Sequence, residues 1–195
     1  MLRETSTYQQ IIKNLLALES FLLRLDLSTE ASRLRVHIEV IQTLEAGRLY
    51  GNIDHIANAQ TRWSMTEATE LAAIHSALSV DPPKELAKKL QLILKGPSQP
   101  QQETTDSNLA RNTAFELALG AKIHTNGVAV HFPDNPDISC DVRGTRVFIQ
   151  CKRPFEEKGV DRNIQRAIRQ LKDDFETADG PAAVGVVAIS LSRIV

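Results

Sequence analysis

Apolar residues recur at the helical period through the first 95 residues of the chain. The spacing predicts one helix from Tyr8 to Leu23 and a second from about Thr29 to Leu49. Ser64-Met65-Thr66-Glu67 has the pattern of a capping box, in which the serine and glutamate side chains satisfy free backbone N–H groups, and predicts a helix start at Ser64. A last helix is predicted from Pro82 to Leu94, with Asp81 as its N-cap.

A polar segment divides the chain after this helical half. Residues 96–105 contain two prolines, three glutamines and no large apolar residue, a composition typical of a linker. We therefore expect an all-α domain over residues 1–95, a linker over 96–106 and a second domain over 107–195.

The second half has the pattern of an α/β domain. The predicted order is helix, strand, strand, strand, helix, strand. Asp106 or Ser107 can cap the first helix, and Gly120 is expected to end it. The last strand is rich in Val and Ile and is expected to be buried; the chain ends directly after it, which suggests a truncated C-terminus. The predicted elements cover residues 107–120, 127–132, 138–142, 146–151, 161–176 and 182–191.

Composition and charge narrow the classes of protein. With 42% hydrophobic and 24% charged residues, the chain has globular composition and is neither disordered nor a disulfide scaffold. A formal charge of −1 gives no overall sign of a nucleic-acid binder. Two cysteines, no apolar run of about 20 residues, and a start without the apolar segment of a signal peptide predict a cytoplasmic protein. None of the five histidines stands in a zinc-binding pattern.

Candidate chemistry gathers on the predicted hairpin of the second half. If Arg143 and Gly144 form a two-residue loop, counting back along the two strands places Asp137 opposite Gln150. Because side chains alternate along a strand, Lys152 shares the face of Gln150. The same register pairs Val142 with Thr145, Asp141 with Arg146, and Ser139 with Phe148.

An acid, an amide and an ammonium on one face can build a hydrolytic site. The carboxylate and amide oxygens suit a hard cation such as Mg²⁺, and the ammonium can orient a water or stabilise charge on a phosphate. Two alternatives stay open: Asp137 can instead cap a turn after Pro136, and Asp141 competes as the acid of the motif, although it fits better as the surface partner of Arg146. Cys140 and Cys151 point to the other face and are expected in the core.

These residues resemble a known family. Pro136-Asp137, followed after 13 residues by Gln150-Cys151-Lys152, is similar to the motif of the PD-(D/E)XK nuclease superfamily. Glu116 stands where that superfamily has an acid in the preceding helix, and the element order matches its core. The resemblance covers residues 107–191. Gln150 departs from the usual Glu or Asp, and resembles the Gln-x-Lys variant of methyl-directed (Mrr-like) restriction endonucleases.

The resemblance implies a restriction-endonuclease-like α/β core with a mixed sheet, and a role for each residue. Asp137 would be the main metal ligand, with Gln150 and the backbone carbonyl of Cys151 completing the set. Lys152 would act on the attacking water. Glu116 would bind or position the metal, or else is a solvated helix acid. The implied cofactor is Mg²⁺, with Mn²⁺ as a substitute, and two remaining carboxylates suffice for a typical Mg²⁺ site.

Local charge favours DNA as the substrate. Residues 143–172 carry nine basic and three acidic side chains, and phosphate backbones are bound by such clusters. An exposed arginine ridge on the second helix can also be merely solvated. In the superfamily this helix often adds a polar residue to the site, and Gln165 is the candidate. The candidate nucleic-acid contacts are Gln165, Arg153, Arg162, Arg166, Arg169 and Lys172.

The sequence thus predicts a Mg²⁺-dependent endodeoxyribonuclease that hydrolyses phosphodiester bonds. The helical half would recognise a target, bind a partner or form a homodimer, because cutting both strands needs two sites. One alternative is a catalytically weak module of the same fold that binds nucleic acid or protein, which Gln150 permits. Another is that residues 1–95 carry the main function as a regulator or assembly subunit.

Overall fold

The computed structural model describes residues 8–49, 59–104, 108–154, 156–177 and 183–191. These residues form six α-helices and a four-stranded mixed sheet, so the fold is α/β. From α5 onward the order is helix, strand, strand, strand, helix, strand, as predicted. The elements are α1 (Tyr8–Arg24), α2 (Arg33–Leu49), α3 (Ala59–Leu78), α4 (Leu86–Leu94), α5 (Leu109–Thr125), β1 (Val130–His131), β2 (Ile138–Val142), β3 (Thr145–Lys152), α6 (Val160–Thr177) and β4 (Ala183–Ile189), with short 3-10 helices at Pro100–Gln102 and Glu157–Gly159.

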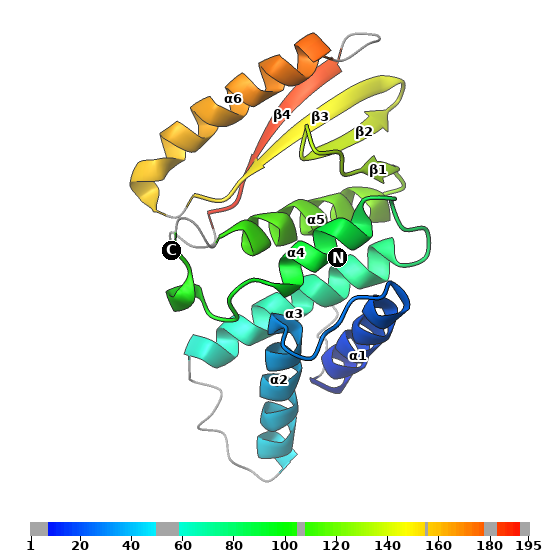
Figure 1. Cartoon of the computed structure of the whole chain (residues 1–195), viewed down its shortest axis with the longest axis vertical. Coiled ribbons are helices and arrows are strands. Elements are labelled where there is room, and N and C mark those ends of the chain that lie inside the picture. The colour runs from blue at the N-terminus through cyan, green and yellow to red at the C-terminus, as the bar shows by residue number, and fades with distance from the viewer. Residues whose placement is uncertain (1–7, 50–58, 105–107, 155, 178–182, 192–195) are drawn as a thin grey trace.

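The sheet has the strand order β1-β2-β3-β4, with β1, β2 and β3 antiparallel and β4 parallel to β3. Figure 1 shows α6 over one face of this sheet and α5 along the other. The loop residues Arg143 and Gly144 both have positive φ (53° and 81°), the conformation that matches the twist of a two-residue hairpin. The predicted pairing across β2 and β3 is confirmed, for example between Ser139 and Phe148.

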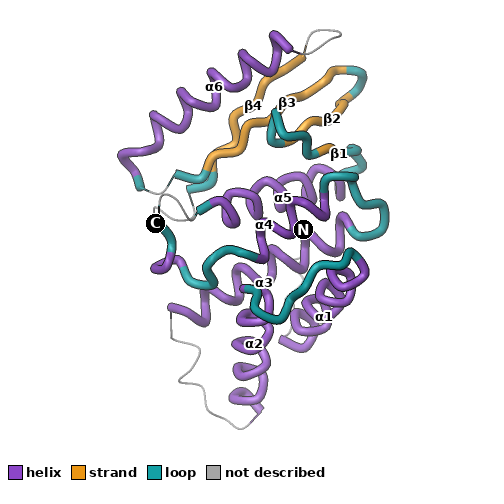
Figure 2. The backbone as a smooth tube through the Cα atoms, in the orientation of Figure 1, coloured by secondary structure: helices purple, strands orange, loops and turns teal. Residues whose placement is uncertain are grey.

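A single hydrophobic cluster runs across the predicted domain boundary. It joins α1, α2, α3 and α4 to α5 and to the inner face of the sheet. Figure 2 shows α3, α4 and α5 beneath the sheet, and α5 packs against both α3 and α4. Glu103, in the predicted linker, is also buried. In the part of the chain that the structure describes, no helix has the length and apolar character needed to cross a membrane.

The inner face of the sheet carries both cysteines. Cys140 and Cys151 are buried, unbridged and part of the hydrophobic cluster, as predicted for core positions. Burial raises the pKa of the Cys151 thiol far above its usual range. Neither thiol therefore has the character of a nucleophile.

Several predicted helix boundaries are wrong. The helix predicted to begin at Ser64 begins at Ala59. Ser64 therefore lies inside the helix, and its hydroxyl contacts His37 Nδ1 (3.2 Å) instead of capping the helix start. The helix predicted from Pro82 begins at Leu86. The second helix begins at Arg33 and not Thr29; the backbone N–H of Arg35 donates to the Ser32 hydroxyl, which caps this start. Asp106 and Ser107 lie outside the described residues, and α5 begins after Asn108.

Two strand predictions also need correction. The strand predicted over residues 127–132 is only Val130–His131. The last strand is not buried: Val184 is 50% and Val186 40% exposed. The reason is that α6 packs on the face of β4 where Gly185 lies, whereas Val184 and Val186 lie on the opposite face of this edge strand. The Val- and Ile-rich composition therefore predicts a strand correctly here, but it does not predict that the strand is buried.

Gly120 does not end the helix as predicted, since α5 continues to Thr125. A Cβ at position 120 would lie 2.4 Å from Cζ of Phe132, so the missing side chain makes room for this buried ring. In an unhindered helix Gly→Ala stabilises by about 1 kcal/mol. We expect Gly120→Ala to lower the free energy of unfolding by about 1–3 kcal/mol, because the clash exceeds that gain.

Urea unfolding of Gly120→Ala and of Gly120→Ala/Phe132→Leu tests this explanation. Next to the smaller leucine, the added methyl group should clash less. The double variant should therefore lose less stability relative to Phe132→Leu than Gly120→Ala loses relative to the wild type. A Gly120→Ala variant more stable than the wild type would refute the clash.

Candidate active site

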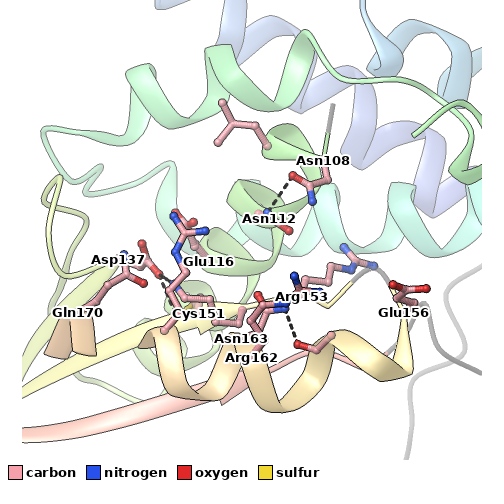
Figure 3. A pocket seen from close by; sticks show the side chains of 14 residues that line it. Asn108, Asn112, Glu116, Asp137, Cys151, Arg153, Glu156, Arg162, Asn163 and Gln170 are labelled. Carbon is pink, nitrogen blue, oxygen red and sulfur yellow. Dashed lines mark hydrogen bonds and ion pairs between the residues drawn. The ribbon is translucent and has the colours of Figure 1, made fainter. Parts of the chain in front are cut away.

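A cavity of about 460 Å³ opens between α5, the end of β3 and α6. Its walls include Glu116 from α5, Asp137 from the turn before β2, and Lys152 at the end of β3. Figure 3 shows Glu116, Asp137 and Cys151 close together on one side of this cavity. The structure therefore brings together residues that are 36 positions apart in the sequence.

Asp137 sits at the centre of the hydrogen bonds of this site. It lies one residue before the pairing of Ile138 with Ile149, where β2 begins. The backbone N–H of Cys151 donates to Asp137 Oδ2 at 2.7 Å, and Lys152 Nζ donates to the same oxygen at 3.4 Å. Asp137 therefore joins the two strand ends across the hairpin, and the alternative in which it merely caps its own turn does not describe these contacts.

Gln150 lies behind the cavity and does not line it. Its side chain is fully buried, and its Oε1 accepts a hydrogen bond from Lys152 Nζ at 3.1 Å. At the other end its Nε2 donates to Asp174 Oδ2 on α6 at 2.9 Å. The sequence reasoning missed Asp174, although Asp174 follows Leu171 by three residues on the apolar side of the predicted helix, where an acid is unexpected.

Glu116 is buried, so the alternative that it is a solvated helix acid is wrong. Lys89 Nζ of α4 lies 2.6 Å from its Oε2. Burial raises the pKa of Glu116, and the hydrogen bond and charge of Lys89 act in the opposite direction. The helical half thus supplies the partner of this acid. A signal for it was present, because Lys89 stands among Leu86, Leu90 and Ile93, on the buried stripe of the predicted helix.

The five predicted nucleic-acid contacts on α6 fall into two groups. Arg162 and Arg166 of α6 line the cavity, whereas Gln165, Arg169 and Lys172 are exposed on the helix and do not line it. Position 165 is therefore not the polar residue that α6 offers to the cavity. That place belongs to Asn163 and Gln170, the latter four residues after Arg166 on the same face.

Arg153 lines the cavity but is directed into the protein. It is 8% exposed, and its Nη1 donates to the backbone carbonyl of Arg111 at 3.3 Å. Burial lowers the pKa of its guanidinium. Arg153 therefore fits a structural contact to α5 better than the predicted contact to DNA.

The donor atoms around the cavity suit a hard cation. The described residues contain no group of three or more His, Cys, Asp or Glu side chains that could hold a metal. The carboxylates of Glu116 and Asp137 nevertheless stand among the residues that line the cavity, as does Cys151, whose backbone carbonyl is the ligand that the resemblance implies. Oxygen donors of this kind fit Mg²⁺ or Mn²⁺ and not zinc. The residues present therefore fit the implied metal, with fewer carboxylates than a tightly binding site would offer.

The ion pair between Lys89 and Glu116 predicts a pH-dependent loss of stability. Replacing Lys89 with methionine removes the influence that lowers the Glu116 pKa, so this pKa rises further. A carboxyl whose pKa is raised on folding favours the fold when protonated and loses this contribution as pH rises through its folded pKa. Relative to the wild type, Lys89→Met is expected to become less stable as pH rises from about 4 to about 8.

Urea unfolding in EDTA across this range measures the effect. Lys88→Met is the matched control. The neighbouring Lys88 pairs with Asp134 on the surface and lowers the pKa of that carboxyl, so its loss should change stability only at the acidic end of this range and not as pH rises toward 8. Parallel pH profiles of Lys89→Met and the wild type would refute the electrostatic coupling of Lys89 to Glu116.

Comparisons of this chain with protein-family models, with curated proteins and with solved structures find no match.

Proposed function

We propose that this protein is a metal-dependent nuclease that hydrolyses DNA phosphodiester bonds, with a PD-(D/E)XK restriction-endonuclease-like core from α5 to β4. The observation that carries the proposal is the meeting of Asp137 Oδ2, Lys152 Nζ and Gln150 Oε1 beside a cavity that two arginines of α6 also line. An acid, an ammonium and an amide oxygen with a phosphate-binding wall suit hydrolysis of a phosphodiester better than a purely structural role.

The residues divide the work in the following way. Asp137, the Cys151 carbonyl and Gln150 would hold a Mg²⁺ ion, with Glu116 binding or positioning it. When bound, the ion supplies acidification of a water and polarisation of the phosphoryl oxygen. Lys152, freed from Asp137, orients the attacking water and stabilises the charge that develops on the phosphate.

Arg162 and Arg166 contribute the affinity for substrate. Both line the cavity from α6, so a phosphate that enters between α5 and α6 meets two guanidinium groups in the same cavity as the acids. Guanidinium groups bind phosphate oxygens in pairs and hold the strand in register. The further basic residues of α6, Arg169 and Lys172, extend this surface along the exposed helix.

The remaining parts of the proposal concern the whole protein. Two copies are expected to act on a duplex, because each strand needs one site. The helical half would form this homodimer or bind a partner protein, and the protein would work in the cytoplasm.

Cleavage of plasmid and linear DNA with Mg²⁺, with Mn²⁺ and with EDTA tests the activity. We expect cutting with either metal and none with EDTA. If the wild type retards DNA in a gel and cuts it with neither metal, the nuclease proposal fails. The alternative of a catalytically weak DNA-binding module, which the amide at position 150 permits, is then the better description.

A further inference from the structure

The side chain of Gln150 is held at both ends by groups of fixed hydrogen-bonding character. Its Nε2 donates to Asp174 Oδ2 at 2.9 Å, and its Oε1 accepts from Lys152 Nζ at 3.1 Å. Gln150 is fully buried and Asp174 is 8% exposed, so water cannot readily replace either contact. The amide therefore belongs to a chain of contacts that runs from α6 through β3 to Asp137.

The chemistry of the two neighbours fixes which way the amide points. An ionised carboxylate only accepts hydrogen bonds, and an ammonium only donates them. A flipped amide would place its oxygen against the Asp174 carboxylate and its NH₂ group against the Lys152 ammonium. Both contacts would then be repulsive, so the oxygen of Gln150 faces Lys152 and Asp137, on the side of the cavity.

The same contact explains why position 150 holds an amide. A glutamate there would place a carboxylate oxygen where Nε2 now lies, about 3 Å from Asp174 Oδ2. Two buried carboxylates at that distance cannot both ionise. The neutral amide at position 150 is thus explained by the buried carboxyl group of Asp174 on α6. Gln150 is therefore not by itself a sign that the site has lost its activity.

We infer that Asp174 is a positioning residue, which directs the oxygen of Gln150 toward the metal site and forms with Gln150 a matched pair that takes the place of an acid at position 150. This inference rests on the proposed function for the role of the oxygen. The pair itself stands on the two hydrogen bonds and on the burial of both side chains.

The first experiment measures the pair without metal or substrate. Urea unfolding in EDTA compares the wild type, Gln150→Glu, Asp174→Asn and Gln150→Glu/Asp174→Asn. We expect Gln150→Glu to be the least stable. The double variant should regain most of the loss, because the asparagine introduced at position 174 can donate to the glutamate introduced at position 150. Additive effects of the two substitutions would overturn the matched pair.

The second experiment measures the direction of the amide by Mn²⁺ titration of the full chain. Asp174→Ala removes the acceptor and is expected to weaken Mn²⁺ binding at least about tenfold, whereas Asp174→Asn retains an acceptor oxygen and should stay near the wild type. In Gln150→Glu/Asp174→Asn the negative charge lies at position 150, beside the proposed metal, and no second carboxylate opposes its ionisation. This variant should therefore bind Mn²⁺ more tightly than Gln150→Glu alone. A purely structural Asp174 would not produce this order.

The outcomes separate the inference from the proposed function. If Gln150→Glu binds Mn²⁺ as tightly as the double variant, or Asp174→Ala as tightly as the wild type, Asp174 does not position the ligand. If none of the proteins binds Mn²⁺ while the unfolding coupling persists, the proposed metal site is overturned and the pair stands as a contact between α6 and β3 only.

Discussion

Replacing Asp137 with asparagine is expected to reduce metal-dependent DNA cleavage by about 10²- to 10⁴-fold, with little change in the fold. Asparagine keeps an oxygen that can accept the hydrogen bond from the Cys151 backbone, so the two strand ends stay joined. What it removes is the negative charge that faces the cavity and would hold the metal. Lys152→Met is expected to cause a loss of similar size, since methionine fills the same volume without the ammonium.

Single-turnover cleavage of a labelled linear duplex, with protein in excess, measures this loss apart from product release. Each variant is also tested for DNA binding in EDTA and for urea unfolding, so that a folding defect is recognised. Lys122→Ala is the control, because Lys122 is exposed on α5 and does not line the cavity. It should cleave at close to the wild-type rate when the protein concentration is saturating. Full activity in Asp137→Asn would remove Asp137 from the proposed site.

The local parts of this site could be predicted from the sequence. A two-residue loop sets the register of a hairpin, and the alternation of side chains then places every residue along both strands. Asp137 and Lys152 needed only this short-range geometry to be brought together. The same alternation predicted that the Cys151 side chain points to the core side of the sheet, and its burial agrees with this prediction.

The long-range parts could not be predicted in the same way. Ser64 and Glu67 have the spacing of a capping box, but in the structure their side chains are taken by His37 and Arg33 of α2. Asp174 could not be matched with Gln150 until the position of α6 on the sheet was known. Each of these partners comes from another element, and local propensity yields to such contacts when side chains are buried.

Buried charges connect the helical half to the core in a way that composition did not indicate. Arg33 of α2 forms an ion pair with Glu67 of α3. Arg111 of α5 forms an ion pair with Glu103, and its Nη1 also lies 3.8 Å from Glu67 Oε1. The side chains are almost fully buried, and the guanidinium of Arg111 stacks over the Trp63 ring at 4.1 Å. Through the Arg111 carbonyl, which accepts from Arg153, this network reaches the residue next to Lys152.

Glu67→Gln is therefore expected to lower the free energy of unfolding by about 3–5 kcal/mol, because it removes the carboxylate that pairs with Arg33 and leaves this buried guanidinium charged. Burial already lowers the pKa of Arg33 to about 10, which still keeps this group cationic at neutral pH. Urea unfolding followed by Trp63 fluorescence and by circular dichroism measures the loss. Arg35→Ala is the control, since Arg35 is partly exposed in its pair with Glu19 and its removal should cost about 0–1 kcal/mol.

The double variant Arg33→Met/Glu67→Gln decides whether the unpaired charge is the cause. Removing a buried ion pair altogether is far less costly than removing one partner, because no uncompensated ion remains. The double variant should therefore be more stable than Glu67→Gln alone, although it lacks one more native side chain. If the two losses simply add, the cost of Glu67→Gln comes from lost packing, and the buried pair does not join the helical half to the α/β core.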